Sequence, residues 1–222
     1  MAVHNAVTMG THGSTWQRSG YAGRGNVEPL LGSLVSRPAI VCGDAEGNWD
    51  EFNEALKILE GSNPVVFGVN KSGMFLFPMH HWVTLHWKNF AIWKDVRWRY
   101  IQLPDGVDNK LHATQLDATN ETRKVHYAWE ALTPTFALSG YFAMQIAYLM
   151  GAEPIVMCGC PGEPKRRFYE RQQRGGFGYG GGAYNADRNI RAQVVNEMRR
   201  VPEFRSKVRS MSGWTKQFFG GM

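Results

Sequence analysis

A continuous apolar stretch in the middle of the chain constrains its fold more than any other feature. Residues 138–159 read LSGYFAMQIAYLMGAEPIVMCG, and Gln145 is the one strongly polar residue across positions 141–150. A helix that is apolar on all sides is buried inside a protein. The short run after the Gly-Ala turn is typical of a central strand that is covered on both faces. The stretch therefore predicts a buried helix over 141–150, followed by a buried strand over 154–159.

Short apolar runs recur along the chain, and each of them predicts a strand: 38–43, 64–70, 82–86 and 96–103. Residues 48–61 predict a helix, with Asn48 as its N-cap and Gly61 as its C-cap. Helical spacing returns over 186–201. Strands that alternate with helical crossovers indicate an α/β fold. We therefore expect a Rossmann-like three-layer sandwich with a mostly parallel, doubly wound sheet.

The two ends of the chain differ from this central pattern. Residues 1–36 are rich in Gly, Ser and Asn and show no periodicity, so we expect an extended N-terminal arm. Such an arm is a candidate for contacts within a homo-oligomer. Residues 37–222 would then form a single domain with a Gly- and Arg-rich insertion at 163–185. The aromatic tail, from residue 210 onward, is expected to pack back onto that domain.

Length and cysteine content narrow the class of protein. No apolar run in the 222 residues approaches the roughly 18 residues that cross a bilayer. The N-terminal residues show no charged segment followed by an apolar one, so we predict neither a signal peptide nor membrane association. Cys42, Cys158 and Cys160 are odd in number and lie in or beside predicted strands. Buried free thiols in a reducing compartment explain them, which predicts a cytoplasmic location.

The net charge of +6 belongs to one C-terminal region. Residues 163–209 hold 12 Lys and Arg against 5 Asp and Glu, a net charge of +7, whereas the remainder of the chain nets −1. Within this region RRFYERQQRGGFGYGGG mixes Arg with Phe and Tyr, in the manner of an RGG segment. The pattern predicts a phosphate-bearing or polyanionic partner such as nucleic acid. A solvated basic face is the alternative.

Candidate ligand contacts lie where the predicted strands end. In an open parallel sheet, ligands bind outside the carboxyl ends of the strands, near the point where the strand order reverses. The first strand ends in CGDAEGN (42–48), where a helix N-terminus favours a phosphate or carboxylate. Asn70 ends the second strand, His86 ends the third, and Ser139 and Gly140 open the apolar helix. The alternative is that these residues form tight turns and that His86 packs among tryptophans.

The order of these motifs resembles a superfamily of small Rossmann-like transferases. PAIVCGDAEGNWDEF, VVFGVNKS, WVTLH and LSGYFAMQIAYLMGAEPIVMCGCPG follow one another over residues 38–162, and SMSGWTKQFFG adds a weaker C-terminal match. The superfamily includes the bacterial α-2,3/2,8-sialyltransferases and the archaeal-type 6-hydroxymethylpterin diphosphokinase-like proteins, with uncharacterised bacterial and phage relatives. In these proteins an SG pair opens an apolar helix, which leads into a strand ending in GxD. The resemblance implies a nucleotide- or nucleotide-sugar-dependent transferase in a bacterial or phage-infected cytoplasm.

The resemblance also implies which residues contact the nucleotide or its sugar. These are residues of the first loop, the ends of the next strands, the SG pair and the last strand's glycine: Gly43, Asp44, Asn70, His86, Ser139, Gly140 and Gly159. Asn48, at the start of the first helix, is a further candidate contact of the nucleotide. Tyrosines after the last strand often hold the leaving phosphate in this family. By residue type, the candidate phosphate contacts are therefore Tyr169, Tyr179 and Tyr184, together with Arg166, Arg167 and Arg171.

Three departures from the family pattern affect the mechanism. The first loop is acidic and one residue longer, Cys160 and Pro161 replace the usual Asp, and no His follows His126. The general base of the sialyltransferases, which comes from the segment after the last strand, is therefore missing.

Two residues are candidates to replace that base. His86 is the better placed, because imidazole exchanges protons near neutral pH. Asp44 is the other candidate, either as a base or as a ligand of Mg²⁺ beside phosphates. We expect no metal cluster of His80, His81 and His86, because residues along a strand alternate between its faces.

Two alternatives stand beside the transferase. The lost Asp and His favour a catalytically degenerate protein that keeps the Rossmann-like frame for binding or assembly. The basic region favours a nucleic-acid-binding protein, or an enzyme that modifies nucleic acid.

Overall fold

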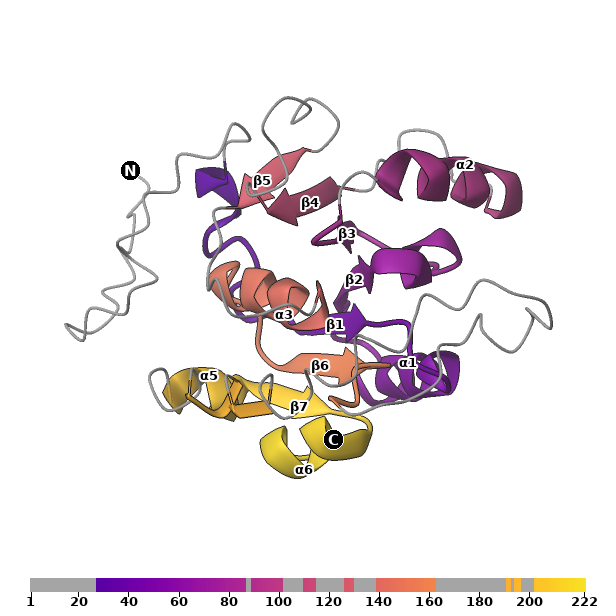
Figure 1. Cartoon of the computed structure of the whole chain (residues 1–222). Helices are drawn as coiled ribbons and strands as arrows, with labels where there is room; N and C mark the ends of the chain where they lie inside the picture. Colours follow the sequence, from indigo (N-terminus) through magenta and orange to yellow (C-terminus); the bar gives the residue numbers. More distant parts are fainter. Residues whose placement is uncertain are drawn as a thin grey trace.

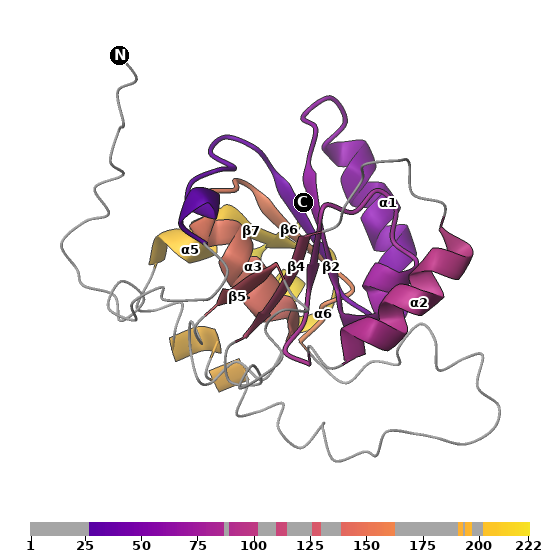
Figure 2. The same ribbon diagram turned by 90° about the horizontal axis from the view of Figure 1, so that it is seen from above.

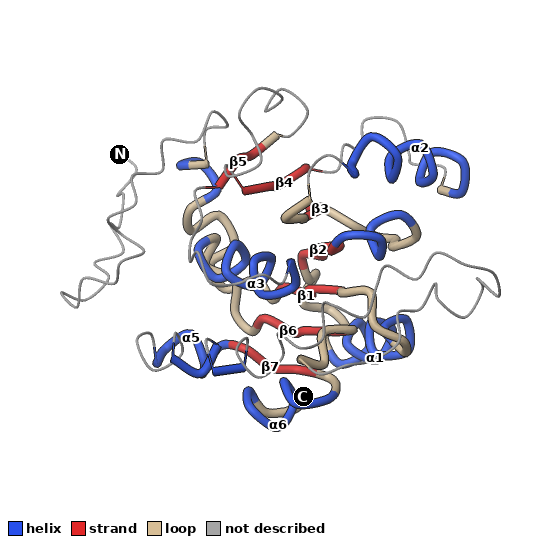
Figure 3. Tube along the Cα trace, viewed as in Figure 1, coloured by secondary structure: helices blue, strands red, loops and turns tan. Residues whose placement is uncertain are grey.

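One parallel sheet organises the part of the chain that the structure describes. The computed structural model describes residues 27–86, 89–101, 110–114, 126–129, 139–162, 191–192, 194–196 and 202–222. Within these residues seven strands pair in the order β5-β4-β3-β2-β1-β6-β7, and all six pairings are parallel. Their bounds are Ala39–Cys42 (β1), Val65–Val69 (β2), His81–Val83 (β3), Lys110–Thr114 (β4), Tyr127–Trp129 (β5), Ile155–Cys158 (β6) and Val208–Ser210 (β7). Figure 3 shows the strands as a ladder from β5 to β7.

The strand order reverses beside β1. The chain moves outward from β1 to β5, then returns through a helix and places β6 on the other side of β1. Crossovers between parallel strands are right-handed, so reversing the direction of travel moves the crossover helix to the opposite face of the sheet. This doubly wound arrangement confirms the expected Rossmann-like α/β fold and sets the switch point between β1 and β6.

Helices cover both faces of the sheet, which gives three layers (Figures 1 and 2). On one face lie α1 (Asn48–Ile58), η2 (Asn70–Met74) and α2 (Phe90–Tyr100). On the other lie α3 (Ser139–Leu149) and α5 (Pro202–Lys207), while α6 (Gly213–Phe219) packs along β7. None of the described helices has the length and apolar character that a membrane span requires.

The helix α3 has the buried character that its sequence predicts. Nine of its residues are buried, including Gln145, and they pack against β1, β2, β3 and β6. The strand β6 that follows is buried at every position. Alternate residues of the central strands therefore face two separate cores, one under α3 and one under α1 and α2.

The prediction of a strand over 96–103 is wrong for the residues of this segment that the structure describes. Residues 96–100 are the second half of α2. The alternation in VRWRY suggested a strand, but Phe90, Trp93 and Arg97 are the buried residues, and their spacing is helical. Trp98 is 74% exposed and faces solvent.

The packed part of the molecule begins before residue 37. Val27 and Leu34 are buried in the core under α3, and η1 (Glu28–Leu30) lies between them. The backbone N–H of Leu34 donates to Met150 O at 2.6 Å, which ties this segment to the end of α3. Residues 27–36 thus belong to the domain, and the rest of the predicted arm lies outside the described residues.

The C-terminal tail packs on the sheet as expected and also protects its edge. The N–H of Ser210 donates to Gly220 O at 2.9 Å, so the chain after α6 pairs with the outer side of β7. A guanidinium nitrogen of Arg209 donates to Val208 O at 2.8 Å on the same strand. These contacts occupy backbone groups that an open edge would offer to another chain.

A buried polar relay crosses β3, β4 and β5 under the α3 face. The indole N–H of Trp129 donates to Nδ1 of His112 at 3.0 Å, and Nε2 of His112 lies 2.8 Å from Nδ1 of His81. Because Nδ1 of His112 accepts, its ring proton sits on Nε2 and is donated to His81. Burial lowers the pKa of His112 well below its usual value and that of His81 to about 3, so both rings are neutral.

Candidate functional site

The predicted contact residues lie along one rim of the sheet. Gly43, Asn70 and Gly159 directly follow β1, β2 and β6, and His86 lies three residues after β3. Ser139 is the first residue of α3. Because the strands are parallel, their carboxyl ends share one edge, and this edge includes the switch point between β1 and β6.

A cysteine fills the space at the switch point. A Cβ on Gly43 would lie 2.4 Å from Gly159 O and 2.5 Å from the Cys160 sulfur. A Cβ on Gly140 would lie 2.8 Å from the same sulfur. The small residues that were expected to admit a ligand here therefore admit the side chain of Cys160, which lies between the loop after β1 and the first turn of α3.

The thiol of Cys160 is neutral in this position. Burial raises its pKa far above the usual value, and the nearby carboxylates of Asp44 and Glu51 raise it further. Cys42 and Cys158, which pair across β1 and β6, also have raised pKa values because they are buried. All three cysteines are free, as the sequence predicts, and none has the character of a reactive thiolate.

A carboxylate occupies the backbone donor after β6. The N–H of Gly159 donates to Oε2 of Glu51 at 2.7 Å. Glu51 lies in the first turn of α1, where a negative charge is favoured by the helix dipole. The backbone N–H of Gly159, a predicted nucleotide contact, therefore already meets an anionic side chain of the protein.

Asn48 is a buried anchor for the first loop and not the N-cap of α1. The N-cap is Gly47, with φ +85°, and Asn48 is the first helical residue and fully buried. Its Nδ2 donates to Gly43 O at 2.9 Å, while its Oδ1 is buried without a hydrogen-bond partner in the described structure. The helix ends at Ile58, so Gly61 lies beyond the C-cap.

A second set of hydrogen-bonded polar residues lies at the ends of β2 and β3. Asn70 has φ +51°, and its Oδ1 accepts from the hydroxyl of Thr84 at 2.7 Å. That hydroxyl in turn accepts from the N–H of His86 at 2.9 Å. The indole N–H of Trp82 donates to Asn70 O at 2.7 Å and fixes the backbone. The chain of bonds holds the backbone of His86 in place and leaves its imidazole exposed.

The start of α3 joins the two parts of the rim. The Oγ of Ser139 accepts from the N–H of Leu85, in the loop after β3, at 3.2 Å. The next residue, Gly140, contacts Cys160 at the switch point. The SG pair therefore lies between the Asn70–Thr84–His86 relay and the switch point, and its hydroxyl holds a loop of the protein.

The described rim is acidic on its α1 side. Asp44 and Glu46 are half-buried in the first loop, and Asp50 and Glu51 lie in the first turn of α1. No group of three or more His, Cys, Asp or Glu side chains among the described residues is arranged to hold a metal ion. Mg²⁺ usually binds one or two carboxylates together with substrate phosphates, so Mg²⁺ binding by Asp44 stays a prediction.

The predicted phosphate contacts lie outside the described residues. This applies to the arginines and tyrosines of the segment after β6, namely Arg166, Arg167, Arg171, Tyr169, Tyr179 and Tyr184.

Sequence reasoning did not assign roles to Glu51 or Thr84 and did not foresee how Cys160 packs. The position of Glu51 in the first helical turn was a usable signal. A negative side chain there is stabilised by the helix dipole and can accept from backbone N–H groups that have no partner within the helix. Thr84 lies two residues before His86 and was hidden within the predicted strand 82–86, which ends at Val83.

Comparisons of the chain with protein-family models, with curated proteins and with solved structures found no significant match.

Proposed function

We propose that this protein binds a nucleotide or nucleotide-sugar along the carboxyl rim and transfers a group from it to an acceptor hydroxyl. The observation that carries the proposal is the clustering of Asn70, Thr84, His86 and Ser139 beside a topological switch point. In open α/β sheets this is the place where ligands bind.

His86 is the proposed general base. Its imidazole is exposed at the rim, and its backbone is fixed by the bond to Thr84. It would take the proton of the acceptor hydroxyl while the nucleotide phosphate leaves with the bonding electron pair. Asp44 would position Mg²⁺ against those phosphates, and the segment after β6 would contribute the Arg and Tyr contacts to the leaving group.

A thermal-shift experiment tests the binding step. Cytidine and guanosine mono-, di- and triphosphates and CMP- and GDP-sugars are added at millimolar concentration, with and without Mg²⁺. A ligand at about ten times its Kd is expected to raise the melting temperature by about 3–6 °C for a chain of this length. If every ligand leaves the melting temperature unchanged, the proposal fails.

Two variants separate binding from turnover. His86→Gln is expected to keep the thermal shift and to lose release of the nucleotide product by at least about a hundredfold. His80→Gln is the matched control, because it removes an imidazole that lies directly before β3, whereas His86 lies after it, and it should leave turnover intact. Turnover equal to wild type in His86→Gln would remove this residue from the mechanism.

A binding protein without turnover is the second candidate. It is favoured by the packing of Cys160 against Gly43 and Gly140 and by the bond from Gly159 to Glu51, which together occupy the switch point. Cys160→Gly would clear this space. If a nucleotide stabilises wild type without any product, the second candidate replaces the first. If a nucleotide stabilises only Cys160→Gly, wild type does not bind it and neither candidate holds.

A further inference from the structure

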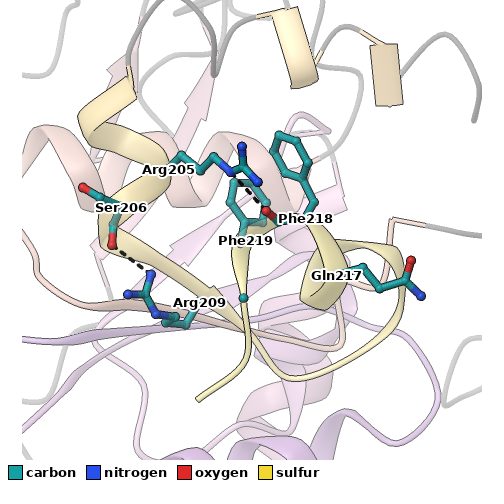
Figure 4. A pocket seen from close by; sticks show the side chains of 7 residues that line it. Arg205, Ser206, Arg209, Gln217, Phe218 and Phe219 are labelled. Carbon is teal, nitrogen blue, oxygen red and sulfur yellow. Dashed lines mark hydrogen bonds between the residues drawn. The ribbon is translucent and has the colours of Figure 1, made fainter.

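A hollow lies along the outer edge of β7, away from the carboxyl rim. It has a volume of about 600 Å³ and is open to solvent. That volume is within the range of sites for small organic ligands, which is about 300–1,000 Å³. Side chains of α5, β7 and α6 line it (Figure 4): Arg205, Ser206, Arg209, Gln217, Phe218, Phe219 and Gly220.

Arg205 is held in one orientation beside the hollow. Its Nε donates to Phe218 O at 3.1 Å, and its guanidinium lies 4.6 Å from the centre of the Phe218 ring. Phe218 stacks in turn on Trp214, over which Arg191 lies at 5.3 Å. The ring of Phe218 supports the guanidinium plane of Arg205, and among the described residues no hydrogen bond or ion pair uses its two terminal nitrogens.

Arg209 faces the same hollow from β7. One of its terminal nitrogens donates to Ser206 O and to Val208 O, each at 2.8 Å. Figure 4 shows Arg209 extended toward Ser206, with Arg205 on the other side of that serine. The hollow therefore has two guanidinium groups whose positions are set by the protein before any ligand arrives.

Neither guanidinium pairs with a carboxylate within the described residues. The carboxylates of Glu153 and Glu203 interact with other side chains. Glu153 forms an ion pair with Lys207 at 2.9 Å, and both carboxylates help to raise the pKa of Tyr148, which burial raises most. Within the described residues, the positive charge in the hollow is thus not balanced by an acidic side chain.

We infer that this hollow binds a phosphate group, carried by a nucleotide unit. Two pre-oriented guanidinium groups match the oxygens of a phosphate through paired N–H donors. The volume of about 600 Å³ exceeds the needs of inorganic phosphate and accommodates a sugar and a base beside Gln217 and Phe218. The phosphate belongs either to a free nucleotide or to the backbone of single-stranded nucleic acid, which share this chemistry.

Arginine labelling of the unmodified protein tests the inference directly. The protein is treated with phenylglyoxal alone or with CMP, AMP, inorganic phosphate or a ten-nucleotide single-stranded DNA, and labelled arginines are identified by mass spectrometry. Protection of Arg205 and Arg209 by a mononucleotide assigns the site to free nucleotides. Protection by the oligonucleotide and not by mononucleotides assigns it to a nucleic-acid backbone. Unchanged labelling of both residues with all four ligands would overturn the inference.

Two double variants that remove the same amount of charge measure how much Arg205 and Arg209 contribute to the affinity for the ligand. Arg205→Gln/Arg209→Gln is expected to weaken binding of the protecting ligand at least tenfold. For the oligonucleotide, it should also reduce the slope of log K against log salt by about 0.7, the value for one neutralised phosphate on a single strand. Lys57→Gln/Lys216→Gln removes the same charge from exposed positions outside the hollow and should change affinity less than threefold.

Equal loss in both pairs would overturn the inference, because it would show a response to total charge alone. Unfolding curves of each variant confirm that the fold is kept. The site lies apart from the carboxyl rim, so its failure leaves the proposed transferase unaffected, and His86→Gln should bind at the hollow as wild type does.

Discussion

Gly159 meets two separate constraints at the switch point, one conformational and one steric. Its φ is +61°, in the left-handed region that side chains disfavour. A Cβ would also lie 2.6 Å from Cβ of Asn48 and 2.8 Å from Gly43 O. A substitution at this position must therefore distort the backbone and also separate the loop after β1 from the end of β6.

Gly159→Ala is expected to lower the free energy of unfolding by at least about 3 kcal/mol, the sum of a left-handed alanine and an overpacked contact. Gly61→Ala is its matched control, because Gly61 has φ +82° but no atom within 4 Å of the added Cβ. The control should lose only about 1–2 kcal/mol. Urea unfolding of both variants measures the difference, and equal losses would contradict the crowding at the switch point.

Glu51→Gln addresses the charge that lies on the proposed nucleotide site. The amide keeps an oxygen acceptor for the N–H of Gly159, whereas the negative charge is removed. If nucleotide phosphates bind at this rim, their affinity should rise about three- to tenfold, as expected for a charge removed in a partly exposed site. Isothermal titration gives the affinity. Glu54→Gln, an exposed change one turn away, is the control, and a fall in affinity would contradict the proposed location.

The residues that end the central strands were predictable from the sequence, whereas contacts that depend on distant packing were not. Gly43, Asn70 and Gly159 were found because they directly follow apolar runs. The bond between Glu51 and Gly159 joins residues 108 positions apart, and the contacts of Cys160 join three separate elements. A single sequence holds no local signal for such pairs.

At the scale of elements, the relay of Trp129, His112 and His81 makes the outer strands sensitive to acid. The pKa values of both histidines are lowered by burial, so the unfolded chain binds more protons below its ordinary histidine pKa of about 6.5. The contribution of these two histidines to the free energy of unfolding is therefore fully present above that pH. It falls steadily as the pH drops toward the folded pKa of His81, which is about 3.

His81→Asn is expected to reduce this acid sensitivity. The asparagine oxygen takes the place of Nδ1 and still accepts from His112, but it does not titrate. The loss of unfolding free energy between pH 7.5 and pH 5 should shrink relative to wild type. Urea unfolding at the two pH values measures it, with His86→Gln as an exposed control. An unchanged loss in His81→Asn would show that this histidine is not a source of the acid sensitivity.

A helix or strand was predictable when nearly all of its residues are buried, because its sequence is then apolar throughout. The strands β1, β2 and β6 are buried at every position and appear as plain apolar runs. The outer strands β4 and β7 contain the polar residues Lys110, His112 and Arg209. These residues are tolerated there because hydrogen bonds or solvent satisfy their polar groups. For that reason β4, β5 and β7 were missed. The helix α2 was mistaken for a strand because its exposed face carries Trp98 and Ile92.

At the scale of the whole molecule, the C-terminal tail completes the sheet. Phe219 is buried in the core under α3, and Gly220 pairs with the outer edge of β7. Truncation after Ser212 should lower the melting temperature by at least about 5 °C through loss of buried apolar surface. It should also cause concentration-dependent association through the exposed edge.

Calorimetry and light scattering measure both effects of the truncation. Removal of Gly221 and Met222 alone is the control, since both are exposed and no strand pairs with them in the described structure. A truncated protein that stays monomeric with an unchanged melting temperature would contradict the role given to the tail.

The reversal of strand order beside β1 also determines when, during synthesis, each neighbour of β1 becomes available for pairing. Ala39 pairs with Val65 on one side and with Ile155 on the other, so one neighbour of β1 is synthesised soon after it and the other very late. A nascent chain that has released β1 to β5 exposes one unpaired flank of its central strand to solvent or to other nascent chains. Non-local parallel pairing of this kind is slow and prone to aggregation. We therefore expect the centre of this protein to close only after translation is nearly finished, and its yield to depend on protection during that interval.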